Sequence, residues 1–155
     1  MSKKRMIDTK FWLDPFVLDE LDSLEKLVYI YLITNPYTNI CGIYELPLKV
    51  MGVETGIETE NLKKVIIPRL EKLGKVKYKN GWIAIKNFIK NQNVGSEDVK
   101  IGIRRELECV PDELREWVVG GSREGLGMMP VTKPNLTKLI NASAKAEDSL
   151  KKNSK

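Results

Sequence analysis

The chain has 155 residues, of which 42% are hydrophobic and 30% charged, and its formal net charge is +5 at pH 7. This is the composition of a globular domain with a single core. It contains no histidine and only two cysteines, which are far apart, so Ser-His and Cys-His catalysis, the usual zinc spacings and a disulfide framework are excluded.

Other enzyme signatures are also missing from the sequence. Neither a phosphate-binding loop nor a dinucleotide-binding glycine motif occurs. We therefore expect a protein that is not an enzyme and needs no cofactor or metal. Cys41 and Cys109 are expected to be buried thiols.

The sequence also gives expectations about location. No apolar run approaches the roughly 18 to 20 residues of a membrane span, and the basic N-terminus is not followed by the apolar segment of a secretory signal. These features favour a cytoplasmic protein without a membrane partner.

Charge is distributed unevenly along the chain. Residues 1–10 carry a net charge of +3, residues 14–58 carry −6, and residues 59–90 carry +7. Clustered positive charge is typical of nucleic-acid-binding proteins. The sequence therefore predicts DNA as a partner, most simply in its double-stranded form.

The first helix is predicted to begin at Asp22 or Ser23, because Asp22 and Glu25 have the spacing of a capping box. Asn35-Pro36 should end it. Its apolar stripe is predicted to consist of Leu24, Leu27, Val28, Tyr31 and Leu32.

A short strand within residues 39–46 and a second helix over residues 47–55 should follow. A third helix is predicted from Thr59 to Leu73, closed by a glycine. Its inward positions are predicted to be Leu62, Ile66, Leu70 and Leu73. Pro68 should kink this helix or end its first half, because proline lacks a backbone donor.

The segment GKVKYKNGWIAIK, residues 74–86, predicts a two-residue β-hairpin. Asn80-Gly81 favours a type I′ turn, in which both central residues need positive φ. In that register one face carries Lys75, Lys77, Lys79, Trp82, Ala84 and Lys86, and the other carries Val76, Tyr78, Ile83 and Ile85. The second face should be core and the first a cationic ribbon, although lysines on an edge strand can also simply prevent strand association.

This order of elements is that of a winged helix-turn-helix within a mostly helical α+β fold with additional C-terminal helices. In that architecture the third helix enters the major groove and the hairpin contacts the flanking backbone. The predicted DNA-binding residues are Asn61, Lys63 and Lys64 on the helix and Lys75, Lys77, Lys79, Trp82 and Lys86 on the hairpin.

Beyond the hairpin, Ser96 is predicted to cap a further helix, and Pro111 could open another. The inward positions of the first are predicted to be Val99, Ile103, Leu107 and Val110. The predicted domains are 1–93, a winged-helix domain with an N-terminal extension; 94–118, accessory helices; and 119–155, a flexible tail with at most a weak helix around 136–150.

Three segments, KKRMIDTKFWLD, LEKLVYIYLITNPYTNICGIYELPLKVM and NGWIAIKNFIKNQ, resemble the N-terminal domain of DnaD-like phage replisome organisers. These are replication-initiation proteins of phages and prophages of low-GC Gram-positive bacteria, and the likeness covers about residues 3–115. Such proteins commonly continue into a C-terminal helical domain. Here the glycine-rich sequence after residue 118 departs from that pattern.

The resemblance implies a winged helix that binds DNA at a replication origin and helps recruit the replicative helicase. It implies a homodimer or higher oligomer, with a helicase or helicase loader as partner. It also suggests that Ile7, Phe11 and Trp12 in the N-terminal extension hold protomers together; alternatively, these residues cover the core of their own domain.

Two other functions remain open at this point. A winged helix is also used by transcriptional regulators, since fold alone does not decide function. The acidic first half could instead bind a basic protein partner, with DNA binding incidental. Helicase-related neighbouring genes would favour replication, and a promoter with an operator palindrome would favour regulation.

Overall fold

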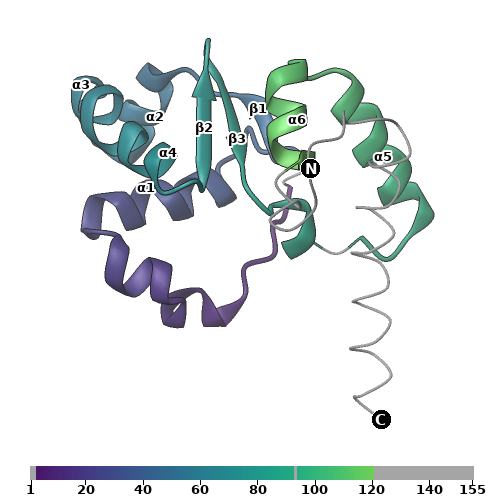
Figure 1. Ribbon diagram of the computed structural model, residues 1–155, viewed down its shortest axis with the longest axis horizontal. Helices are drawn as coiled ribbons and strands as arrows, with labels where there is room; N and C mark the ends of the chain where they lie inside the picture. Colours follow the sequence, from purple (N-terminus) through teal and green to yellow (C-terminus); the bar gives the residue numbers. More distant parts are fainter. Residues whose placement is uncertain (1–2, 93, 121–155) are drawn as a thin grey trace. The chain divides into compact units, whose positions relative to one another are not determined.

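The computed structural model describes residues 3–92 and 94–120 (Figure 1). The protein is α+β and mostly helical, with one small antiparallel sheet of three strands. The described residues form two compact units, residues 3–38 with 42–86, and residues 39–41 with 87–92 and 94–120. The predicted weak helix around 136–150 and the tail from residue 121 lie outside the described residues.

The first unit contains the predicted helices and strands in the predicted order. They are α1 (Ser23–Thr34), β1 (Ile43–Glu45), α2 (Leu48–Thr55), α3 (Thr59–Asn61), α4 (Ile67–Lys72), β2 (Val76–Lys79) and β3 (Trp82–Ile85). A π-helical segment, Leu62–Ile66, joins α3 to α4. Two short helices before α1 were not predicted, a 3-10 helix at Thr9–Leu13 and a π-helical turn at Phe16–Glu20.

The capping box at the start of α1 is confirmed. The Glu25 backbone N–H donates to Asp22 Oδ1 at 2.8 Å, and the Asp22 N–H donates to Glu25 Oε2 at 3.0 Å. Each of these bonds satisfies a backbone donor that would otherwise lack a partner at the helix N-terminus. Helix α1 therefore begins where the sequence predicts.

The predicted apolar stripe of α1 is partly wrong. Leu24 and Leu27 are 43% and 42% exposed. The inward face is formed by Glu25, Val28 and Leu32, which share one side because they lie three and four residues apart. Since the capping box turns the Glu25 side chain inward, positions 24 and 27 rotate towards solvent.

Asn35 ends α1 and ties it to the sheet. Its buried side-chain amide donates to the Tyr31 and Leu32 carbonyls and to the Tyr44 hydroxyl, and its side-chain oxygen accepts from the Tyr37 N–H. Burial raises the pKa of Tyr44, whose hydroxyl also donates to the Leu32 carbonyl. A buried amide with all these partners fixes the direction in which the chain leaves the helix.

The sheet has the strand order β1-β3-β2, and both strand pairs are antiparallel. The hairpin register is as predicted, with Lys79 opposite Trp82 and Lys77 opposite Ala84. Asn80 and Gly81 have φ of 50° and 82°, as a type I′ turn requires.

One face of the hairpin is core, as predicted. Val76, Ile83 and Ile85 are buried on it, whereas Tyr78, the fourth residue predicted there, is half-buried. Helix α4 packs against β2 (Figure 1). Helix α2 in turn contacts both α1 and α3. The apolar side chains of the hairpin thereby join those of the helices in one core.

The other face is not an open cationic ribbon along its whole length, and this part of the prediction is wrong. Ala84 is fully buried, as is its β1 neighbour Ile43. β3 is the central strand of the sheet, so Ala84 has a cross-strand neighbour on each side, Ile43 on β1 and Lys77 on β2. A pairing with a strand that lies about forty residues earlier could not be inferred from the hairpin sequence alone.

The second unit contains a 3-10 helix at Ile89–Asn91 and two helices, α5 (Glu97–Glu108) and α6 (Asp112–Gly120). The predicted cap is confirmed, since Ser96 Oγ accepts from the Val99 N–H at 3.3 Å. Of the predicted inward positions, Ile103, Leu107 and Val110 are buried and Val99 is half-buried. No helix in the described part of the chain is long and apolar enough to cross a membrane.

The two cysteines differ in their surroundings. Cys41 is buried as predicted, and the Glu106 carboxylate accepts hydrogen bonds from the N–H groups of Ile40 and Cys41 at 2.8 and 3.1 Å. Cys109 is exposed, so the prediction of a buried thiol there is wrong. It caps the C-terminus of α5, outside the buried stripe of that helix.

Candidate nucleic-acid interface

The helix predicted to enter the groove is a continuous helical run, which we call the 59–72 helix. It consists of α3, the π-helical segment and α4. The chain leaves it through Leu73 and Gly74, whose φ of 72° fits a glycine after a helix C-terminus. The predicted bounds are thus confirmed within about one residue.

Pro68 does not end this helix, contrary to one of the two predictions made for it. Instead, the turn before it is widened, and the Ile67 N–H donates to the Leu62 carbonyl five residues earlier. Widened turns of this kind are rare and often lie at functional sites. Because the hydrogen bonding shifts before Pro68, the missing proline N–H is accommodated without breaking the helix.

The wide turn has a consequence for the side chains that face solvent. Leu62, Ile66 and Ile67 are all buried. The three residues between Leu62 and Ile66 are all exposed. These exposed residues are Lys63, Lys64 and Val65. A π turn rotates the chain by less per residue than an α turn, so two successive isoleucines can face the core while three successive side chains face outward.

The predicted DNA-binding residues of this helix differ in their environments. Asn61 is half-buried, and Lys63 is exposed. Lys64 is exposed but its Nζ lies 2.9 Å from Glu60 Oε2. Sequence reasoning did not identify Val65, which is 56% exposed; the only signal for its outward position was Pro68, three residues later.

The C-terminal part of the 59–72 helix is attached to the hairpin. Glu71 Oε1 accepts a hydrogen bond of 2.8 Å from the Tyr78 N–H of β2. This bond satisfies a backbone donor on the outer edge of the sheet. It also sets the position of the hairpin relative to the helix that precedes it.

The hairpin residues divide into a tip and a base. Lys79 is exposed and stands opposite the half-buried Trp82, next to the turn. Lys75, Lys77 and Lys86 are half-buried. The lysines at the base are therefore less accessible than the lysine at the tip.

The Lys75 side chain already has a partner within the protein. Lys75 Nζ lies 4.4 Å from the centre of the Phe16 ring, a cation–π contact that attaches the strand to the N-terminal segment. Lys77, Lys79 and Lys86 each take part in a further interaction.

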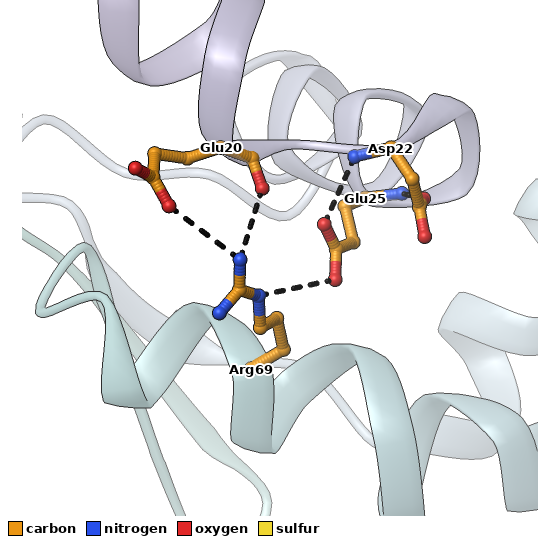
Figure 2. A network of polar contacts seen from close by, with 4 residues as sticks. All are labelled: Glu20, Asp22, Glu25 and Arg69. Atoms are coloured by element: carbon orange, nitrogen blue, oxygen red, sulfur yellow. Dashed lines mark hydrogen bonds and ion pairs between the residues drawn. The ribbon is translucent and has the colours of Figure 1, made fainter.

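Arg69 holds the other side of the 59–72 helix in place (Figure 2). Its guanidinium donates to the Glu20 carbonyl at 3.2 Å and lies 3.5 Å from the Glu20 carboxylate and 3.8 Å from that of Glu25. Glu25 is buried and belongs to the α1 capping box. Figure 2 shows its carboxylate between Arg69 and the Asp22 N–H. One side chain thus links the 59–72 helix to the N-terminal segment and to the start of α1.

The three N-terminal residues suggested for oligomerisation are not equivalent. The Phe11 ring stacks on Tyr29 with 5.9 Å between ring centres and meets Trp12 edge-on at 5.0 Å. Burial, with a contribution from Asp14, raises the pKa of Tyr29 to about 12. Trp12 is 53% exposed, and Ile7 is also exposed. Phe11 therefore packs on its own chain, whereas Trp12 and Ile7 are exposed to solvent.

In the residues described, no group of three or more His, Cys, Asp or Glu side chains could hold a metal ion. No protein-family model, curated protein or solved structure matches this chain. What the protein does is therefore inferred from its own residues.

Proposed function

We propose that this chain is a DNA-binding protein of the winged helix-turn-helix class, with the 59–72 helix in the major groove and the β2–β3 hairpin as the wing. The order of elements supports this, as does the hairpin with its type I′ turn directly after the helix. The observation that carries the proposal is the exposure of Lys63 and Lys64 on the helix together with Lys79 at the hairpin tip. All three lie in the segment 59–90, whose net charge is +7.

In this proposal the lysines supply most of the affinity. Lysines that neutralise phosphates release condensed counterions, so binding weakens as salt concentration rises and depends little on sequence. Asn61, whose amide can donate and accept at a base edge, is the polar candidate for sequence recognition. The function is one of binding and positioning, and it involves no chemical step.

The resemblance to DnaD-like replisome organisers supports replication initiation as the biological role. The partners would be origin DNA, further copies of this chain, and a helicase or helicase loader. The exposure of Ile7 and Trp12 is consistent with contacts between protomers.

Charge reversal tests the proposed interface. Lys63→Glu and Lys79→Glu should each weaken binding to a random-sequence duplex by about tenfold at low salt, since each replaces a phosphate contact by repulsion. Lys10→Glu, which makes the same charge change on the exposed surface of the N-terminal 3-10 helix, is the matched control. Equal loss in all three variants would mean that only net charge matters and would contradict the interface.

Genome-wide mapping of bound DNA in the source cell tests the biological role. For a replication initiator, occupancy should concentrate at a replication origin, and a helicase component should coprecipitate. Occupancy confined to promoters would contradict this role and favour the transcriptional regulator.

A further inference from the structure

Val65 is an unusual residue for the centre of the outward surface of the 59–72 helix. It is 56% exposed, follows directly on Lys63 and Lys64, and lies three residues before the exposed Pro68. Valine is a weaker helix former than alanine, leucine or lysine, so neither helix stability nor solvation favours it there. The wide turn before Pro68 is what directs it outward.

We infer that Val65 recognises the C5-methyl group of a thymine in the major groove. This inference rests on the proposed DNA-binding function. Thymine is the only standard DNA base that presents a methyl group in the major groove, and small apolar side chains contact it directly. Valine has no hydrogen-bonding group, so an apolar contact is the only way in which it can distinguish bases.

The neighbours of Val65 fit this arrangement. Lys63 and Lys64 would bind phosphates on the groove wall and so hold the helix in position. Asn61 lies one helical turn before Val65, and an asparagine amide matches the adenine N6 and N7 pair. Together the two residues predict a binding site in which an adenine and a thymine lie within a few base pairs of one another.

Replacing thymine by uracil removes only this methyl group, so it tests the contact directly. A preferred duplex is first selected from a random pool with the full chain. It is then synthesised with uracil in place of each thymine in turn. At one or two positions the wild-type protein should bind the uracil duplex about fourfold more weakly, which corresponds to the loss of one buried methyl.

The Val65→Ala variant should show a smaller difference between the thymine and uracil duplexes than the wild type, because the shorter alanine side chain leaves less apolar surface for the methyl group. It should fold normally, because the position is exposed and alanine is the better helix former. Val53→Ala is the matched control, since Val53 is a valine of α2 that is 80% exposed. This control should retain the wild-type preference for thymine.

The outcomes separate this inference from the proposed function. If the wild-type protein binds duplex DNA but no thymine-to-uracil change matters, the inference is wrong and the DNA-binding proposal stands. The same conclusion follows if Val65→Ala keeps the full thymine preference of the wild type. If the protein binds no duplex at low salt, the proposed function itself fails.

Discussion

At the level of single residues, Arg69 has the largest structural role among the charged side chains of the candidate interface. It contacts both Glu20 and Glu25, and the Glu25 side chain is only 8% exposed. A largely buried carboxylate is stable only when its oxygens have partners. Arg69 therefore contributes to the fold first, and any contact it makes with DNA would come at the expense of these bonds.

Arg69→Gln should lower the free energy of unfolding by about 1–2 kcal/mol, a value between those for exposed and buried ion pairs. Urea denaturation measures this loss. Glu20→Gln removes the more exposed carboxylate and should cost less than about 0.5 kcal/mol. Equal losses in the two variants would show that Glu25 does not depend on Arg69.

Tyr29 should make stability depend on alkaline pH. Its pKa is raised from 10.0 to about 12 in the folded protein, so between these values the unfolded chain loses the proton that the folded chain keeps. The stabilisation linked to Tyr29 is fully present below pH 10 and is lost as the pH rises through 12.

Tyr29→Phe keeps the ring that packs against Phe11 and Phe16 but removes the hydroxyl. The urea midpoint of this variant should therefore fall less steeply across this pH range than that of the wild type. Parallel curves for the two proteins would contradict the raised pKa.

At the level of elements, the hairpin depends on its turn. Gly81 has φ of 82°, and a Cβ added there would meet no atom within 4 Å. Gly81→Ala should therefore destabilise the protein through backbone strain alone, by about 1–2 kcal/mol. Asn80→Gly is the control, because glycine accepts positive φ freely, and its denaturation curve should stay close to that of the wild type. A fully tolerated Gly81→Ala would contradict the type I′ turn.

The elements that the sequence predicts well are those with local determinants. The Asp22–Glu25 capping box, the Ser96 cap and the Asn80-Gly81 turn each depend on residues within a few positions of one another, and all three are present. Features that depend on distant contacts were missed. The outward rotation of Leu24 and Leu27 and the burial of Ala84 against β1 are the clearest cases.

In the candidate interface too, the features with local determinants were predictable and the others were not. The exposure of Lys63, Lys64 and Lys79 follows from helical and strand periodicity. The outward position of Val65 does not follow from periodicity. It depends on a wide turn, and the only sign of that turn in the sequence is Pro68. The Lys75 contact with Phe16 could not be predicted either, since it joins segments about sixty residues apart.

At the level of the whole molecule, the distribution of charge along the chain also supports the proposed DNA binding. The basic segment 59–90 contains the 59–72 helix and the hairpin, and the acidic segment 14–58 contains α1, β1 and α2. Both elements proposed to contact DNA therefore lie in the basic segment, whose positive charge should attract the phosphates.

The measurement that tests this proposal most directly is the fluorescence anisotropy of a labelled random-sequence duplex, titrated with the full chain at several salt concentrations. If about five phosphates are contacted, the logarithm of the association constant should fall against the logarithm of salt concentration with a slope of about −4.5. A single strand of equal length, titrated in parallel, shows which form of DNA is preferred. No binding at low salt, or binding without salt dependence, would contradict DNA binding and leave a protein partner as the better explanation of the charged surface.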